Sequence, residues 1–204
     1  FTSDANSNHK NPKTYTGFIE RNTKTTSNTI TGFDYLLSLG ITHLQLMPVF
    51  DFATMDERNV DVFYNWGYDP IQFNTPDGSY ATSVSDPSLR VIELKELVAA
   101  LHLHGIRVNM DVVYNHVYDL EQSSFEKIVP YYYFRRSESG AVSNGSFCGN
   151  DFDSNRLMGR KFIVDSCKMW MKEYGFDGFR FDLMGIIDIE TMNTIDKELR
   201  KIKP

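Results

Sequence analysis

An arginine and an aspartate stand two positions apart in the segment Gly178–Gly185, inside an otherwise apolar run. Residues two apart on a β-strand point to the same face, so Arg180 and Asp182 would project together. The alternate face of that strand would be apolar, carrying Phe179, Phe181 and Leu183. Taking charge out of water is costly unless the charge is paired, so this pattern indicates either a structural ion pair at a strand end or a functional site.

The elements that must position this pair follow from three glycines. Three helical patterns each end at a glycine and lead within about a residue into a short hydrophobic strand pattern. The glycines are Gly40, Gly105 and Gly175, and the strand patterns are Ile41–Val49, Ile106–Tyr114 and Phe176–Met184. Glycine just past a helix is the expected left-handed cap, and a strand directly after a helix is half of a βαβ unit. Three such units in order predict a parallel sheet.

The spacing of apolar residues also predicts the helices. Two segments carry apolar residues at intervals of three and four, which indicates one buried stripe on each helix. The stripes are Leu94, Leu97, Val98 and Leu101 in the first segment, and Ile163, Cys167, Trp170 and Tyr174 in the second. Asp86 followed by Pro87 marks the start of the first helix. A further helical pattern comprises Ile189, Met192, Ile195 and Leu199.

Polar residues with chemical potential gather where the strand patterns end. These residues are Asp111, Asn115, His116, Arg180 and Asp182. The stretches that leave the first two strands, roughly 50–87 and 117–158, are long and rich in Asn, Asp, Gly, Ser, Tyr and Phe. Loops of that length inside a compact domain are usually functional. Parallel α/β folds, TIM barrels above all, build their active sites at this end of the strands.

Composition limits the classes of protein. The 204 residues include 21 Lys and Arg against 27 Asp and Glu, with no basic run, which argues against nucleic acid as the main partner. Neither a long apolar stretch nor a signal-peptide pattern is present, so we expect no membrane span. Two cysteines are too few for a disulfide scaffold. Cys167 is expected to be a core thiol, whereas Cys148 in a loop is left open between a free and a paired state.

Four blocks together resemble the type I pullulanases of the α-amylase superfamily of glycoside hydrolases. Asp111–His116 resembles the first superfamily signature, and Gly178–Gly185 resembles the second. Tyr64–Pro70 resembles the heptapeptide of type I pullulanases, which cleave α-1,6 branch linkages. The fourth block is the set of shorter stretches Leu46–Phe52, Lys127–Pro130, Asn144–Ser146 and Cys148–Asn150. All four occur in the right order and together cover most of the chain from Thr14 onward.

The resemblance implies a retaining glycosidase with assigned roles. Such enzymes need a carboxylate nucleophile and a second carboxylic acid about 5 Å away. Asp182 matches the nucleophile, and Arg180 is its natural positive partner. Tyr68 matches the aromatic residue that stacks on the sugar at the cleavage subsite, and His116 matches a residue that hydrogen-bonds sugar hydroxyls. Three further substrate-site candidates are Trp66, Met184 and Asp111, the last of which more often supports such a site than touches substrate.

Other interpretations of these residues stay open. Without the heptapeptide, Tyr68 and Trp66 would be ordinary core aromatics of a loop packed on itself. Asn115 corresponds to a calcium-binding position in many α-amylases and is a metal candidate only through that resemblance; no cofactor is otherwise expected. His102 and His104 are two apart on a helix end, so they face different directions and we expect no metal site between them.

The resemblance also predicts what the chain lacks. The family's general acid is a Glu on the next barrel strand, whereas the only Glu residues after Asp182 are Glu190 and Glu198, both in a helical pattern. We therefore expect residues 1–204 to form strands two to four of a (β/α)8 TIM barrel, with 1–13 as a polar N-terminal stretch. We expect this part alone to be inert and marginally stable, because its acid and the rest of its barrel would lie elsewhere.

The sequence favours a pullulanase-like debranching hydrolase acting on branched α-glucans. An isoamylase-type enzyme or an α-amylase is the alternative within the superfamily, and the heptapeptide argues against both. A non-catalytic carbohydrate-binding module would not need Arg180 and Asp182 together. A doubly wound nucleotide-binding domain is disfavoured, because no Gly-rich phosphate-binding pattern follows a strand. Secreted, cell-surface and cytoplasmic locations all stay open.

Overall fold

A parallel sheet of three strands lies at the centre of the protein. In the computed structural model, which describes residues 2–60 and 64–204, the strands are hydrogen-bonded in the order β1-β4-β5. Their bounds are His43–Leu46 for β1, Arg107–Val112 for β4 and Gly178–Phe181 for β5. Both pairings in this sheet are parallel. The predicted α/β class with parallel strands is therefore confirmed.

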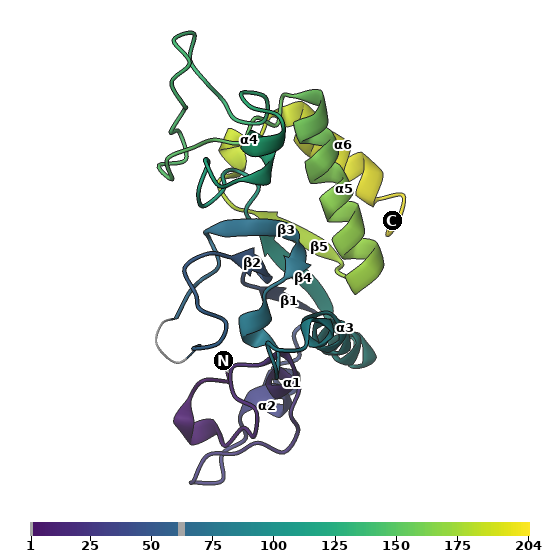
Figure 1. Ribbon diagram of the computed structural model, residues 1–204. Helices are drawn as coiled ribbons and strands as arrows, with labels where there is room; N and C mark the ends of the chain where they lie inside the picture. Colours follow the sequence, from purple (N-terminus) through teal and green to yellow (C-terminus); the bar gives the residue numbers. More distant parts are fainter. Residues whose placement is uncertain (1, 61–63) are drawn as a thin grey trace.

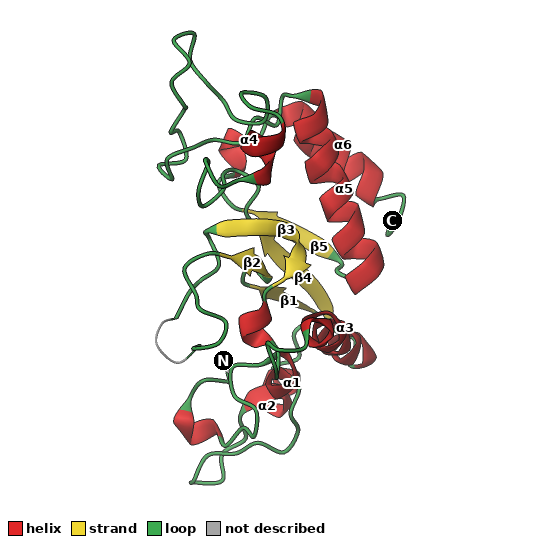
Figure 2. Ribbon diagram, viewed as in Figure 1, coloured by secondary structure: helices red, strands yellow, loops and turns green. Residues whose placement is uncertain are grey.

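Helices alternate with these strands. The longer ones are α2 (Gly32–Ser38), α3 (Pro87–Leu103), α5 (Leu157–Tyr174) and α6 (Ile189–Leu199). The short elements are η1 (Ala5–Ser7), α1 (Tyr15–Phe18), η2 (Gly78–Tyr80), α4 (Ser124–Ile128) and η3 (Met184–Ile186). Figures 1 and 2 show α3, α5 and α6 on one side of the strands, with the long loops projecting on the other.

The three predicted glycine caps have the left-handed backbone that the pattern requires. Their φ angles are 65° at Gly40, 73° at Gly105 and 83° at Gly175. Each strand begins two or three residues after its glycine, and each is shorter than the hydrophobic pattern that predicted it. The ends of each apolar run leave the sheet ladder. Val49, Ile106, Val113, Tyr114 and Phe176 stay in the core, whereas Leu183 and Met184 are exposed.

Both predicted helix stripes are buried. Asp86 caps α3 by accepting from the backbone of Ser88, and Pro87 occupies the first turn as expected. All four stripe residues of α3 are at most 2% exposed, and those of α5 are at most 8% exposed. In α6 the prediction holds for Ile195 and Leu199, but Ile189 is 79% exposed. Ile189 is wrong as a stripe member because it stands at the first position of the helix, before the buried turns begin.

The stretch after β1 is more regular than the sequence predicts. The expected loop of residues 50–87 contains an antiparallel pair, β2 (Phe50–Phe52) with β3 (Pro70–Pro76). This pair forms a second sheet, separate from the three-stranded parallel sheet, and the sequence patterns did not predict it. Buried Phe50 and Phe73 meet edge-on in this pair, with ring centroids 5.7 Å apart. The pairing fixes the two ends of the segment that carries the heptapeptide.

The faces of β4 explain how the fold separates core from site. Val108, Met110 and Val112 alternate along the strand and are all fully buried. Each such side chain contributes about 1.5–3 kcal/mol of hydrophobic free energy. Asp111 lies between two of them and points to the opposite face.

In residues 2–60 and 64–204, no helix combines the length and apolarity needed to cross a membrane.

Candidate active site

The candidate site begins where β4 and β5 end side by side. The parallel register pairs Asp111 with Arg180 across these strands. Asp182 follows β5 directly, and its backbone N–H donates to the carbonyl of Val112 at 2.9 Å. The chain then turns through Leu183, a non-glycine residue with a φ of 44°. The strand ends therefore bring together two aspartates and one arginine.

One guanidinium nitrogen joins these three side chains. Nη1 of Arg180 lies 2.9 Å from Oδ1 of Asp182 and 3.0 Å from Oδ1 of Asp111. The hydrogen bond to Asp111 is the largest of the influences that raise the pKa of Arg180. The Asp111 side chain is 2% exposed, whereas that of Asp182 is 20% exposed. The predicted ion pair between Arg180 and Asp182 is confirmed, and the buried Asp111 binds the same nitrogen of Arg180.

Asn115 holds Asp182 from a second direction. Its side-chain amide donates to the backbone oxygen of Asp182 at 2.9 Å and approaches carboxylate Oδ2 at 3.3 Å. With Arg180 on Oδ1, the carboxylate thus has a donor on each oxygen. These contacts fix its orientation toward solvent. The sequence pointed to Asn115 as a metal candidate and did not reveal this contact.

Tyr68 approaches the same cluster from the segment between β2 and β3. Its hydroxyl donates to Oδ2 of Asp111 at 2.7 Å. Burial, followed by the hydrogen bond and the charge of Asp111, raises the pKa of Tyr68 to about 12. The hydroxyl therefore remains a donor at neutral pH, and the ring is held beside Asp182.

An open pocket of about 660 Å³ lies in front of Asp182. Its lining is mainly aromatic and apolar, made of Met47, Tyr64, Trp66, Tyr68 and Asp182. Sequence reasoning did not single out Met47 or Tyr64 as lining residues. Only their positions in the sequence could have indicated this role. Met47 follows β1 directly, and Tyr64 begins the heptapeptide. A single carboxylate facing flat aromatic surfaces is suited to binding sugar rings next to a nucleophile.

The loop that carries Trp66 is built to expose it. Gly67 has a φ of 83°, and a Cβ there would lie 2.9 Å from the backbone oxygen of Pro48. The N–H of Gly67 donates to Asn65, whose amide donates to Asp69 at 3.1 Å. Trp66 is 63% exposed, so the interpretation of this residue as a core aromatic is wrong.

His116 and Met184 lie outside the side chains that line this pocket. His116 is 4% exposed, and its Nδ1 is hydrogen-bonded to the side-chain oxygen of Asn115. Burial lowers the pKa of His116, which favours the neutral ring. Met184 is 55% exposed at the start of η3. Direct sugar contact by either residue stays a prediction.

The surroundings of Asn115 do not fit a calcium ion. Calcium requires six to eight oxygen ligands. The side-chain oxygen of Asn115 is bonded to His116 and its backbone oxygen accepts from Phe152. In the described part of the chain, the one group of three His, Cys, Asp or Glu side chains close enough to share a metal is Asp51, Glu57 and Asp77, which does not include a neighbour of Asn115. The residues around Asn115 therefore do not form a calcium site.

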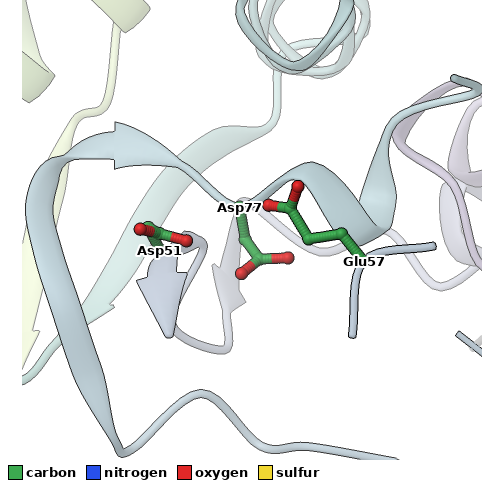
Figure 3. A group of neighbouring side chains, drawn as sticks. All are labelled: Asp51, Glu57 and Asp77. Atoms are coloured by element: carbon green, nitrogen blue, oxygen red, sulfur yellow. The ribbon is translucent and has the colours of Figure 1, made fainter. Parts of the chain in front are cut away.

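Two members of the acidic group formed by Asp51, Glu57 and Asp77 have protein partners. Figure 3 shows the three carboxylates beside β2 and the end of β3. Arg90 binds both oxygens of Glu57, at 2.9 Å and 2.7 Å. Asp77 is fully buried and accepts from the backbone N–H of Ser79 at 2.8 Å. Burial, then the charges of Asp77 and Glu57, raises the pKa of Asp51 to about 6.

The two helix-end histidines have separate partners, as expected. His102 Nε2 lies 2.7 Å from a carboxylate oxygen of Asp177. His104 contacts Arg21 and the backbone of its own helix. Both cysteines are free, with Cys167 buried and Cys148 exposed. The expected core thiol is confirmed, and Cys148 forms no disulfide within the described residues.

A known family model matches this sequence. The alpha amylase catalytic domain model matches residues 21–142, more than half of the chain. The chain therefore belongs to the alpha-amylase catalytic-domain family. Within that family it is homologous to type I pullulanases, as the next comparisons show.

Two relatives and two solved structures define that similarity. The pullulanase of Bacillus subtilis strain 168 is 48% identical over 204 residues, which is 100% of this chain and 28% of that protein. Pullulanase 1, chloroplastic, of Arabidopsis thaliana is 37% identical over 185 residues, covering 74% of this chain and 19% of that protein. The structure of a pullulanase from Anoxybacillus sp. LM18-11 complexed with maltotetraose has a TM-score of 0.98 at 51% identity. That alignment covers 100% of this chain and 30% of the other.

A type I pullulanase from Bacillus subtilis complexed with maltose also has a TM-score of 0.98, at 48% identity. The alignment covers 100% of this chain and 29% of that chain. The chain thus spans less than a third of the length of the pullulanases that it matches.

Proposed function

We propose that these residues supply the nucleophile side of the active site in a retaining pullulanase-type glycoside hydrolase that cleaves α-1,6 branch linkages. The single observation that carries the proposal is the carboxylate of Asp182, held by Arg180 and Asn115 at the edge of the aromatic pocket. A nucleophilic carboxylate must present one oxygen to the anomeric carbon in a fixed direction. Two hydrogen-bond donors provide that fixed direction.

The aromatic lining supports a sugar substrate. Tyr68 presents its ring while Asp111 holds its hydroxyl, so stacking does not compete with hydrogen bonding. Trp66 offers a second flat surface, since 63% of it is exposed. The Anoxybacillus relative carries maltotetraose in its structure, which supports an α-glucan as the substrate class here.

The second carboxyl group of the reaction has no candidate in the cluster. Asp111 is buried and accepts from both Arg180 and Tyr68, so it is unsuited to donate a proton to a leaving oxygen. We propose that the general acid comes from a residue outside this cluster and that β1, β4 and β5 correspond to strands two to four of a complete barrel. The ion-paired, buried Asp111 then positions Arg180 and Tyr68.

The test is product analysis on pullulan with the full-length protein. Cleavage of α-1,6 linkages alone releases maltotriose, and we expect that product. Asp182→Asn should lower kcat by at least about 10³-fold, since no nucleophile remains, while Asp196→Asn on the exposed face of α6 should leave it unchanged. Products of α-1,4 cleavage would contradict the proposed linkage, and full activity in Asp182→Asn would contradict the assigned nucleophile.

A further inference from the structure

A second loop is tied to the residues that hold Asp182. Asn150 makes two hydrogen bonds with the backbone of Val117, accepting at 2.9 Å and donating at 2.8 Å. The N–H of Phe152 donates to the backbone oxygen of Asn115 at 2.8 Å. Since Asn115 itself binds Asp182, the loop is fastened one residue away from the candidate nucleophile.

Internal hydrogen bonds give this loop a defined shape. Asp151 accepts from the side chain of Ser143 and from the backbone N–H groups of Gly145 and Ser146, the latter two at 2.7 Å. Asn144 accepts from the N–H of Gly149, also at 2.7 Å. The residues between these contacts are therefore held in place before any ligand arrives.

The loop presents one large apolar side chain to solvent. Phe147 is 90% exposed, more than any other large hydrophobic residue in the described ranges. Its φ of 61° is the left-handed region, which is uncommon for a bulky residue and costs about 1 kcal/mol or more. Among residues 2–60 and 64–204, its ring has no aromatic or cationic partner. A fixed loop that displays an aromatic ring in this way is suited to an incoming flat apolar surface.

The neighbouring residue places this loop near Asp182. Cys148 donates from Sγ to the backbone oxygen of Ser146 at 3.5 Å. Burial is the main cause that raises the pKa of the Cys148 thiol, and the negative charges of Asp182 and Asp151 raise it further. The tip of the loop therefore lies within electrostatic reach of the candidate nucleophile.

We propose that Phe147 stacks on a glucosyl unit of the α-glucan, on the side of Asp182 reached from β4. Trp66 lines the pocket beside Asp182 from the segment between β2 and β3. The two aromatic residues would therefore hold different units of one substrate. This inference rests on the proposed function. The occupant is a sugar because the loop is continuous with the candidate site through Asn150 and Asn115, and sugar rings carry apolar faces that stack on aromatic rings.

The experiment uses the full-length protein and two measurements. Calorimetry on Asp182→Asn protein measures the Kd for maltohexaose without hydrolysis, and steady-state kinetics on pullulan measures KM and kcat. Phe147→Ala should raise both Kd and KM about three- to tenfold, the value of one aromatic stacking contact, with kcat changed less than about twofold. Phe147→Trp should retain wild-type values, while Phe147→Leu should resemble Phe147→Ala.

Leu103→Ala is the matched control, because Leu103 is 84% exposed at the far end of α3 and should change neither constant. Unchanged Kd and KM in Phe147→Ala would overturn this inference and leave the proposed function intact. A melting temperature lowered by several degrees with unchanged KM would mean that Phe147 packs against another part of the protein, which also overturns it. If the Asp182→Asn protein binds no maltohexaose and neither the unsubstituted protein nor Leu103→Ala degrades pullulan, the proposed function fails as well.

Discussion

Nη1 of Arg180 lies 2.9 Å from Oδ1 of Asp182, two positions further along the same strand end. The same nitrogen also contacts both oxygens of Asp111, at 3.0 Å and 3.1 Å. A single cationic group therefore connects a buried carboxylate to a solvent-facing one. The position of Asp182 depends on that connection.

Replacing Arg180 should weaken catalysis without removing the fold. Lysine carries the charge, but its flexible stem is shorter and would not hold a nitrogen where Nη1 of Arg180 contacts both carboxylates. We expect Arg180→Lys to lower kcat about 10- to 100-fold on pullulan, the value of one charge-assisted hydrogen bond. Arg200→Lys is the control, because Arg200 binds Asp196 on an exposed helix face. Wild-type kcat in Arg180→Lys would contradict this role.

Two substitutions of Tyr68 separate the contribution of its ring from that of its hydroxyl. Tyr68→Phe removes one hydrogen bond to Asp111 and should lower kcat/KM about three- to tenfold. Tyr68→Ala also removes the stacking face and should lower it at least about tenfold further. Tyr35→Ala, at an exposed position on α2, should have no effect. Equal losses for Phe and Ala, measured as kcat/KM on a branched glucan, would assign the whole effect to the hydroxyl.

Gly67 should tolerate no side chain. Gly67→Ala adds a Cβ 2.9 Å from the Pro48 oxygen at a φ of 83°, so the heptapeptide loop must shift. We expect a lower melting temperature, a cost of about 1–3 kcal/mol, and a higher KM. Gly140→Ala is matched in φ, at 85°, but meets no atom within 4 Å. Its loss should be smaller and KM unchanged; equal effects in both variants would show that backbone strain alone is responsible.

The parallel sheet and its helices could be predicted because local rules agree there. Glycine caps at Gly105 and Gly175 and the buried stripes of α3 and α5 each point to the same βαβ arrangement. The β2–β3 pair escaped prediction because β2 has three residues and β3 is bounded by prolines, so neither shows clear alternation. Its register also shifts at Asp51.

The site was predictable where neighbours share a strand and less so where contacts cross loops. Arg180 and Asp182 face the same way by the period of a strand, and their ion pair follows from that. The hydrogen bond from Asn115 to Asp182 joins residues 67 positions apart, and no sequence pattern in either segment indicates it. The burial of His116 likewise depends on which way its ring turns, which spacing does not specify.

Asp51 should make stability depend on pH. Its pKa is raised to about 6 from an ordinary value of 3.8, so the folded state retains a proton that the unfolded state releases. The contribution of Asp51 to the free energy of unfolding should therefore fall as pH rises from about 4 through 6. Asp51→Asn should remove this slope and stabilise the protein at pH 7 by about 1 kcal/mol, discounted because the side chain is partly exposed.

Denaturant unfolding at several pH values checks this prediction. The control is Asp196→Asn, since that carboxylate is 63% exposed on α6. An Asp51→Asn protein that keeps the wild-type slope between pH 4 and 7 would show that Asp51 is not the group responsible.

The most direct test of the account is covalent labelling of the nucleophile. A ring-fluorinated α-glucosyl fluoride forms the glycosyl-enzyme but slows its hydrolysis, so the intermediate accumulates on the attacking carboxylate. After reaction with the full-length protein and proteolysis, mass spectrometry should find the added glycosyl mass on Asp182 and no label in Asp182→Asn. A label on Asp111 or on any other carboxylate, with Asp182 unmodified, would contradict the account.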